Sequence, residues 1–274
     1  MSEAKVFLIT GASSGMGKTT AIDLIKKGHI VYGAARRIDR MRELEELGGY
    51  ALKMNITDEL SVKEVVDHII KKHGRIDVLW NNAGFGLSGT LEETSISDAK
   101  YQFDVNIFGL ARITQLVIPH MRERGSGTII NTSSMGGKVY TPLLGWYHAT
   151  KHALEGMSDC LRVELKPFGI NVVILEPGAI ETEFGAVAFE DLVERSGHGP
   201  YKPMVDSYVN VMNKYYKPGS SSPTSVISKT IEKIIESPRP KTRYLVGKMA
   251  KPMVCLRNTF GDRAYDKVID LMLK

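Results

Sequence analysis

The stretch KVFLITGASSGMG at residues 5–17 joins an apolar run to a glycine-rich loop, and a helical pattern follows it directly. Glycines at such a turn let backbone N–H groups approach a pyrophosphate, and the N-terminus of the following helix adds a favourable field. The glycines are Gly11, Gly15 and Gly17, which gives Gly-x-x-x-Gly-x-Gly instead of the commoner Gly-x-Gly-x-x-Gly. This stretch therefore predicts the first β-α unit of a dinucleotide-binding domain.

The same stretch has a second interpretation, as the phosphate loop of a nucleoside triphosphatase. Residues 12–19 end in Gly17-Lys18-Thr19, although Ala12 stands where that motif has its first glycine. Lys18 would then contact the β- and γ-phosphates, and Thr19 would bind Mg²⁺. No later predicted strand runs into an acid that would hold Mg²⁺, so the dinucleotide interpretation is favoured.

Short apolar runs alternate with longer helical patterns along the whole chain. The runs cover residues 5–10, 30–35, 50–54, 77–80, 127–132, 170–175 and 243–246, and the helical patterns cover 16–28, 39–47, 59–73, 96–124, 147–167 and 224–236. Strands that are apolar throughout are typical of a sheet with both faces covered, and repeated β-α-β units specify a parallel sheet. We therefore expect one α/β domain over residues 1–274, of the doubly wound Rossmann type. It should have a mainly parallel seven-stranded sheet with helices on both faces.

Two segments depart from this alternation. Residues 181–223 contain many Gly, Pro, Tyr and Ser, with one probable helix near 204–216, and we expect them to form a substrate loop or lid. Residues 249–274 are expected to form a C-terminal helical extension of two short helices. Five aromatics argue that the first segment is ordered: Phe184, Phe189, Tyr201, Tyr208 and Tyr215.

The composition excludes several classes of protein. Hydrophobic residues make up 43% and charged residues 24%, and the net charge of +5 comes from Lys and Arg scattered among acids, which argues against nucleic-acid binding. Cys160 and Cys255 form neither a disulfide scaffold nor a metal-site spacing, so no metal is predicted. The apolar run before Gly11 is too short for a signal peptide, and no run approaches about 20 apolar residues, the length of a membrane span. We expect a cytoplasmic protein without an integral membrane segment.

Tyr147 and Lys151 form the clearest candidate for catalysis. Residues four apart lie on one face of a helix, so the phenol and the ammonium can share one site. The pKa of a free tyrosine is near 10, and a neighbouring cation lowers it by stabilising the phenolate. Ser134 precedes the tyrosine by 13 residues and adds a hydroxyl. These residue types predict general acid–base chemistry.

Taken together and in order, these motifs resemble the classical short-chain dehydrogenase/reductase family over about residues 4–183. The start TGASSG, the run YHATKHALEG at 147–156 and the long C-terminal region are similar to one branch, which includes 17β-hydroxysteroid and retinol dehydrogenases and acyl-dihydroxyacetone-phosphate reductases. Asn55 departs from the pattern, since the family usually has Asp there. The matching residues are Thr10, Gly11, Gly15, Gly17, Asn81, Asn82, Ala83, Gly84, Asn106, Ser134, Tyr147, Lys151, Pro177, Gly178 and Thr182.

The resemblance implies a role for each polar residue of the site. Tyr147 would exchange a proton with the substrate oxygen while a hydride moves to or from the nicotinamide. Ser134 would orient that oxygen, with neighbouring Ser133 as the alternative. Lys151 would hold the nicotinamide ribose and lower the pKa of Tyr147. Asn106, or the helix that it distorts, would hold a water between substrate and Lys151.

The resemblance also implies a nicotinamide dinucleotide along the carboxyl edge of the sheet. NADP(H) is favoured over NAD(H), because Ala35 occupies the usual acidic position and two guanidiniums suited to a phosphate follow it. Arg36 is the expected principal contact of the 2′-phosphate. Asp39 is either a late acid or, as we favour, the cap of the next helix. The expected contacts are Gly11, Ser13, Ser14, Gly15, Met16, Gly17, Arg36, Arg37, Asn55, Ile56, Asn82, Ala83, Gly84, Tyr147, Lys151, Pro177, Gly178, Ile180 and Thr182.

The expected small-molecule substrate is a bulky, mostly apolar carbonyl compound or secondary alcohol. Its predicted pocket comprises Phe85, Met135, Val139, Tyr140, Leu143, Trp146 and the aromatics of 184–216, although Tyr140 and Trp146 are equally compatible with the core. A non-catalytic NADP-binding regulatory module is the alternative function. By resemblance we also expect a homodimer or homotetramer that pairs through helices 99–123 and 147–167.

Overall fold

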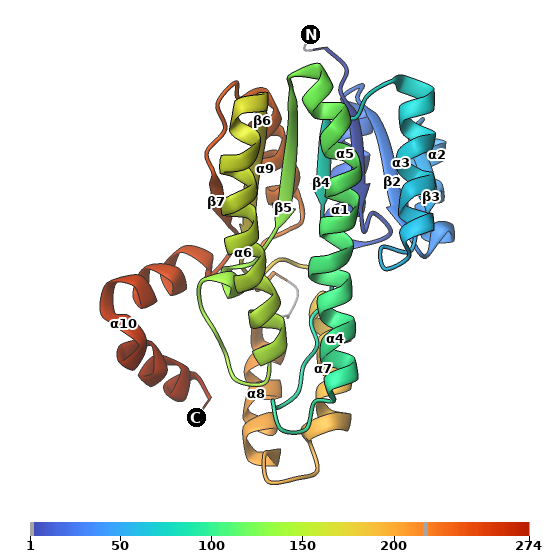
Figure 1. The fold of residues 1–274 in the computed structure, drawn as a ribbon. Helices are drawn as coiled ribbons and strands as arrows, with labels where there is room; N and C mark the ends of the chain where they lie inside the picture. The colour runs from blue at the N-terminus through green and yellow to red at the C-terminus, as the bar shows by residue number, and fades with distance from the viewer. Residues whose placement is uncertain (1–2, 216–218, 274) are drawn as a thin grey trace.

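The structure, a computed structural model that describes residues 3–215 and 219–273, has one seven-stranded sheet at its centre (Figure 1). In spatial order the strands are β3 (Tyr50–Lys53), β2 (Ile30–Ala35), β1 (Val6–Thr10), β4 (Val78–Asn81), β5 (Gly127–Thr132), β6 (Ile170–Pro177) and β7 (Arg243–Val246). Every neighbouring pair is parallel. The strand order reverses between β1 and β4, which is where doubly wound sheets bind their ligands. The predicted fold is therefore confirmed as a single Rossmann-type domain.

Helices cover both faces of this sheet (Figure 1). One face carries α1 (Gly15–Lys26), α2 (Arg42–Glu46) and α9 (Ser225–Glu236), and the other carries α3 (Glu59–His73), α5 (Leu110–Arg124) and α6 (Gly145–Leu165). Along β1, Phe7 and Ile9 belong to the first core, whereas Val6 and Leu8 belong to the second. Because successive strand residues point to opposite faces, a strand buried on both faces must be apolar throughout.

The predicted helix 96–124 is interrupted in its middle. It consists of α4 (Ile96–Phe103), a π-helical segment called η2 (Asp104–Gly109) and then α5. A π-segment has one extra residue in its turn, and such turns are frequent at functional sites. The buried Asn106 lies in this segment, so the predicted distortion around it is present.

Three further helices extend beyond the carboxyl edge of the sheet (Figure 1). They are α7 (Phe184–Ser196), α8 (Lys202–Tyr215) and α10 (Ala250–Met272). The helix predicted near 204–216 is α8, whereas α7 was not predicted. Gly261 has φ 75° inside α10 and divides it, which confirms two helices in the C-terminal extension. The side chains of Phe189 and Tyr215 lie outside the described part of the chain, as do residues 216–218 of the predicted lid.

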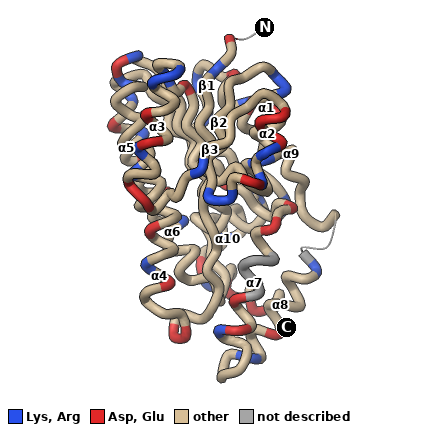
Figure 2. Tube along the Cα trace, turned by 90° about the vertical axis from the view of Figure 1, so that its right-hand side faces the viewer, with Lys and Arg blue, Asp and Glu red and all other residues tan. Residues whose placement is uncertain are grey.

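Charges of both signs are interspersed over the helices in the view of Figure 2. The chain carries 36 Lys and Arg against 31 Asp and Glu, and this view shows no continuous basic surface of the kind that nucleic-acid binding requires. Among the residues that the structure describes, no helix combines the length and apolar character needed to cross a bilayer.

Candidate active site

The glycine loop is fastened to the end of β4 by hydrogen bonds. Thr10 Oγ1 accepts from the backbone N–H groups of Asn82 at 3.0 Å and Ala83 at 2.9 Å, and Asn82 Nδ2 donates to the carbonyls of Thr10 and Gly11. A Cβ on Gly17 would lie 2.5 Å from the Gly11 carbonyl oxygen and 2.6 Å from Asn82 Nδ2. Gly17 therefore permits the close approach of the loop to Asn82, and we assign it a packing role instead of a direct cofactor contact.

The residues present fit a bound dinucleotide. Gly11 and Gly15 have φ of 68° and 52°, values that glycine adopts without strain. Ser14 precedes α1 without a capping hydrogen bond from its side chain, and the first turn contains no acid. The first N–H groups of that helix thus face a space suited to an anion. Asn82 Oδ1, buried beside the loop, has no partner among the described residues.

Lys151 and Tyr147 lie together on α6, as their spacing predicts. Lys151 Nζ donates to the Thr132 carbonyl at 2.8 Å and lies 5.7 Å from the centroid of the Tyr147 ring. Burial lowers the pKa of Lys151 to about 8, and the Glu155 carboxylate opposes that shift. The ammonium is therefore still the main form at neutral pH. The ring of Phe184 lies 5.6 Å from that of Tyr147 and covers it from the side of α7.

Ser134 is held in place at the start of the short helix η3 (Met135–Gly137). Its Oγ accepts from the Gly136 N–H at 3.0 Å and lies 3.5 Å from the Pro177 carbonyl oxygen. The hydroxyl of Ser133 is buried, and a Cβ on Gly137 would lie 2.6 Å from it. Ser133 thus packs against the backbone of Gly137, and both serines contribute to the wall of the cavity described below.

Asn106 holds the loop after β4 against α6. Its Oδ1 accepts from the Phe85 N–H at 3.1 Å, and its Nδ2 donates to the Phe85 carbonyl at 2.9 Å and to Thr150 Oγ1 at 3.2 Å. A Cβ on Gly84 would lie 3.1 Å from Asn106 Oδ1. The geometry therefore gives Asn106 a positioning role on this loop.

One cavity of about 540 Å³ joins these residues. Its walls contain Ser134, Tyr147, Lys151 and all of the expected cofactor contacts except Gly17. Asn106 also lies outside the wall. The predicted cofactor residues in the wall are Gly11, Ser13, Ser14, Gly15, Met16, Arg36, Arg37, Asn55, Ile56, Asn82, Ala83, Gly84, Tyr147, Lys151, Pro177, Gly178, Ile180 and Thr182.

Some residues of the predicted substrate pocket lie in the wall of this cavity and others do not. Phe85, Met135, Val139, Phe184 and Tyr208 line the cavity. Four other predicted residues do not line the cavity. The hydroxyl of Tyr140 donates to Asp266 at 2.7 Å, and that of Tyr201 donates to Glu92 at 2.6 Å. Leu143 packs in an apolar cluster, and the ring of Trp146 packs against Phe103.

The wall also contains residues that were not predicted, and five of them lie on α8 and α10. They carry no motif, and only their place in the folded chain brings them to the site. They include Leu144, Met212, Met249, Met253, Tyr265, Ile269 and Met272.

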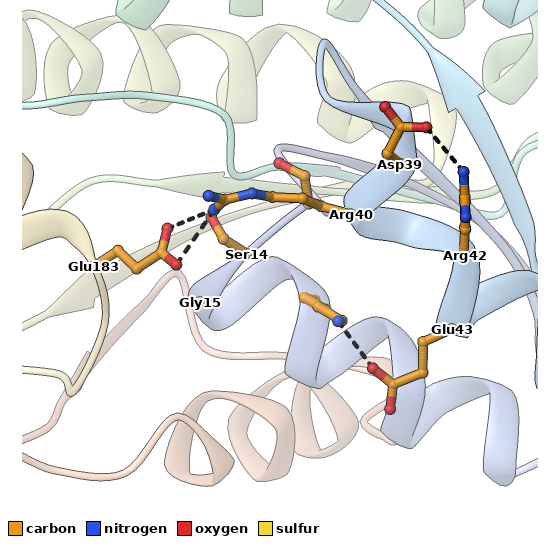
Figure 3. A pocket seen from close by; sticks show the side chains of 9 residues that line it. Ser14, Gly15, Asp39, Arg40, Arg42, Glu43 and Glu183 are labelled. Carbon is orange, nitrogen blue, oxygen red and sulfur yellow. Dashed lines mark hydrogen bonds and ion pairs between the residues drawn. The ribbon is translucent and has the colours of Figure 1, made fainter.

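Basic side chains near the glycine loop fall into two groups. In a neighbouring hollow of about 410 Å³, Lys18 pairs with Glu43, Arg40 with Glu183 and Arg42 with Asp39 (Figure 3). Asp39 makes no helix cap, since Arg37 and Met41 occupy the cap positions, so our preferred interpretation of it was wrong. The ion pair with Glu43 also gives Lys18 a structural role, so its presence does not require the phosphate-loop interpretation.

Arg36 and Arg37 form the second group. Arg36 donates to the Tyr101 hydroxyl at 3.1 Å, and Arg37 reaches the hydroxyls of Ser14 at 3.3 Å and Ser13 at 3.5 Å. Within the described part of the chain, neither arginine has a carboxylate partner. Both line the large cavity, so two guanidiniums with uncompensated charge face the expected nucleotide site.

His148 fixes the loop between Ser134 and Tyr147. Its Nδ1 lies 2.9 Å from the Gly136 carbonyl oxygen, and its Nε2 accepts from the Thr141 N–H at 2.9 Å. Burial lowers the pKa of His148 to about 4. The ring is therefore neutral at pH 7 and makes both contacts in that form.

Comparison with known proteins agrees with this geometry. The family described as short chain dehydrogenase matches residues 5–192. The chain is 42% identical to a 3-ketodihydrosphingosine reductase of Bacteroides thetaiotaomicron over 183 residues, which are 66% of each protein. It is 31% identical to an NADPH-dependent 3-dehydrocapnine reductase of Ornithobacterium rhinotracheale, over 97% of this chain and 96% of the relative. A crystal structure of a short-chain dehydrogenase from Streptomyces avermitilis is 32% identical, with a TM-score of 0.81 over 97% of this chain and 98% of that one.

The chain belongs to the short-chain dehydrogenase family. It is accordingly an oxidoreductase that acts on CH–OH or C=O groups with a nicotinamide cofactor.

Proposed function

We propose that the protein is an NADP(H)-dependent oxidoreductase that interconverts a bulky, mostly apolar carbonyl compound and its secondary alcohol, with Tyr147 as general acid and base. The observation that carries this proposal is the shared cavity. Ser134, Tyr147 and Lys151 line the same cavity as the glycine loop and a set of apolar side chains. This arrangement supports catalysis over a purely regulatory dinucleotide module, which has no use for all three groups.

The chemistry of the chain's own residues follows from their placement. When bound, the nicotinamide supplies or accepts the hydride. Tyr147 donates its proton to the substrate oxygen during reduction and removes the hydroxyl proton during oxidation. The Lys151 ammonium stabilises the phenolate form of Tyr147 and would hold the nicotinamide ribose. Ser134 fixes the substrate oxygen by a hydrogen bond, and Asn106 positions the Phe85 backbone.

The two serines allow a matched test of this assignment. Ser134→Ala should lower kcat about 10²–10³-fold, because a hydrogen bond to the developing oxyanion is lost. Ser133→Ala removes a hydroxyl that packs against Gly137 and should leave kcat within about threefold, since that hydroxyl does not contact the reacting oxygen. Steady-state rates of both variants with one ketone decide between them, and the reverse order would move the role to Ser133.

The choice of NADP(H) rests on Arg36 and Arg37. Both guanidiniums face the cavity with only hydroxyl contacts among the described residues, whereas the neighbouring Lys18, Arg40 and Arg42 are each paired with an acid. A 2′-phosphate would supply the charge that these two arginines lack. We assign Arg36 as its principal contact and add Arg37 with Ser13 as a second.

A thermal-shift titration with NADPH, NADH and Mg·ATP tests the cofactor directly. We expect NADPH to raise the melting temperature more than NADH at equal concentration, because a ligand stabilises the native state in proportion to its affinity. Preference for NADH would reject the arginine assignment. Stabilisation by Mg·ATP alone would reject the hydride-transfer proposal and return the phosphate-loop interpretation.

The names of the two relatives support a ketone as the substrate class, since both are called reductases of a keto or dehydro compound.

We also propose a homodimer or homotetramer that pairs through η2–α5 and α6. Phe108 and Val163, which lie on those elements, are 57% and 63% exposed. The two exposed, unpaired thiols Cys160 and Cys255 are compatible with the reducing cytoplasm that we propose as its compartment. Light scattering of the purified chain tests the oligomer.

A further inference from the structure

Part of the cavity wall is apolar and rich in methionine. Five of its wall residues form what we call the methionine chamber: Met135, Met212, Met249, Met253 and Met272. Met135 directly follows Ser134 in the chain, so the chamber begins beside the hydroxyl assigned to the substrate oxygen. The chamber is therefore continuous with the reacting centre.

The chamber walls are elongated because they are helix faces. Tyr208 and Met212 on α8 are four residues apart, and Tyr265, Ile269 and Met272 on α10 follow at spacings of four and three. Such spacings place side chains in a row along one side of a helix. Two rows that face one cavity make a trough, a shape that suits an extended occupant.

The charged wall residues come from elements other than α8 and α10. Among the described wall residues, the charged ones are Arg36, Arg37, Lys151 and Glu183. The first two face the nucleotide site, Lys151 serves Tyr147, and Glu183 directly follows the expected cofactor contact Thr182. A charged group in the chamber would therefore be buried without a partner, which is costly.

One residue of the chamber wall, Met249, has a strained backbone conformation. Met249 precedes α10 with φ 64°, a conformation that residues other than glycine rarely adopt. Glycine would relieve that strain but would remove a thioether from the cavity wall. Methionine side chains are unbranched and have three rotatable bonds, so they adapt to a flexible occupant better than to one rigid outline.

We infer that the methionine chamber binds an unbranched alkyl chain attached to the carbonyl carbon of the substrate. This inference rests on the proposed function, because it names the substrate class of the same site. Each methylene that enters the chamber leaves water, which contributes about 0.8 kcal/mol and corresponds to about a fourfold gain in kcat/KM.

The first test uses a series of methyl ketones from 2-butanone to 2-dodecanone with NADPH. We expect kcat/KM to rise about fourfold per methylene until the chamber is filled. At ten carbons, 2-decanone should exceed the rigid bicyclic trans-1-decalone by at least about tenfold, since only the flexible chain follows the trough. Rates that do not depend on chain length, or a preference for the decalone, would overturn the inference.

A matched pair of variants on α8 locates the effect. Met212→Trp fills part of the chamber and should lower the ratio of kcat/KM for 2-dodecanone over 2-butanone by at least about tenfold, the equivalent of about two excluded methylenes. Met204→Trp introduces the same side chain on the same helix, at a position that is 39% exposed and outside the cavity wall. It should leave that ratio and the turnover unchanged. Equal effects of both variants would place the chain elsewhere.

Calorimetric titration with 1-butanol, 1-hexanol and 1-octanol separates this inference from the proposed function. Affinity should rise about fourfold per methylene, and Met212→Trp, but not Met204→Trp, should abolish that rise. If alcohols bind in this way while no ketone oxidises NADPH, the chamber is retained and the hydride-transfer proposal fails. If ketones are reduced without any length dependence in rate or binding, the proposed function stands and the alkyl-chain inference fails.

Discussion

The two ends of the large cavity are constructed by different means. At the nucleotide end, Thr10 and Asn82 fasten the glycine loop to β4 through backbone hydrogen bonds, and the close approach at Gly17 excludes any other residue. At the chamber end, side chains from α8 and α10 enclose an apolar space. The first end is specified by backbone geometry and the second by side-chain volume. Substitutions at one end should therefore change cofactor use, and substitutions at the other should change substrate choice.

Tyr147 lies where the two ends meet, and its loss should have the largest effect. Tyr147→Phe removes the proposed proton donor and should lower kcat about 10²–10⁴-fold, while NADPH affinity changes little. Fluorescence titration of NADPH and steady-state rates with 2-decanone measure the two quantities. Tyr140→Phe is the matched control, because the Tyr140 hydroxyl contacts Asp266 outside the cavity wall. Turnover of Tyr147→Phe within tenfold of the unaltered protein would remove Tyr147 from its role.

His148 should make the loop between the two ends sensitive to acid. Burial holds the pKa of His148 at about 4, below its usual 6.5. Between these values the unfolded chain binds more protons than the folded one. The free energy of unfolding therefore falls as pH drops from about 6.5 through 4, by about 3 kcal/mol in total.

Urea unfolding of the unaltered protein and His148→Asn at several pH values between 7 and 4 measures this contribution. Other groups also titrate in this range, including Glu176, whose pKa burial raises to about 7, so the difference between the two proteins is the relevant quantity. The variant should lose less stability on acidification. His198→Asn, at an exposed position, should behave like the unaltered protein. Parallel curves for all three proteins would contradict the prediction.

At the nucleotide end, Arg36→Asp and Arg37→Asp should each lower the NADPH:NADH ratio of kcat/KM by about 10–100-fold, the value of a charge-assisted hydrogen bond. Because these arginines do not line the methionine chamber, the remaining activity of both variants should depend on the chain length of the ketone as it does in the unaltered protein. Arg42→Asp is the charge-matched control, since Arg42 already pairs with Asp39 and lies in the neighbouring hollow. An equal shift in the control would show that the general field, and not the two cavity-facing guanidiniums, sets the preference.

The smallest effect is expected from the ion pair between Arg40 and Glu183, which lies beside the nucleotide end. Arg40, after β2, contacts Glu183, just before α7, at 2.9 Å, and both side chains are about half exposed (Figure 3). Exposed pairs contribute at most about 1 kcal/mol, so Glu183→Gln should change the free energy of unfolding by less than that amount. Urea unfolding at low and high salt measures the change. A loss of several kcal/mol would contradict the weak contribution expected of this exposed pair.

The same contrast explains what the sequence could predict. The strand ends agree with the structure to within two residues, because apolar runs between glycines and caps have a strong local signal. The spacing of the glycine loop, Ser134, Tyr147 and Lys151 along the chain predicted a shared site, and these residues line one cavity. The π-segment around Asn106 was indicated only by resemblance, since one extra residue in a helical turn leaves no periodic signal.

The chamber could not be predicted in the same way. Met212, Met253 and Met272 are ordinary apolar helix residues in sequence, and only the course of the chain brings them to Ser134. Tyr140 and Trp146 have the composition of a pocket but pack outside it. A pocket formed by apolar side-chain volume leaves no motif in the sequence, so the residues of this end can be identified only from the three-dimensional structure.

The central claim is that a hydride passes from the nicotinamide to a carbonyl carbon beside Tyr147. The direct test is to incubate the protein with NADPH deuterated at C4 of the nicotinamide ring, on either face, together with 2-decanone, and to analyse the alcohol by mass spectrometry. The account predicts that one of the two deuterated cofactors transfers its label to the carbinol carbon, and that Tyr147→Phe yields little labelled alcohol. An alcohol without label from either cofactor, or label formed equally well by Tyr147→Phe, would contradict it.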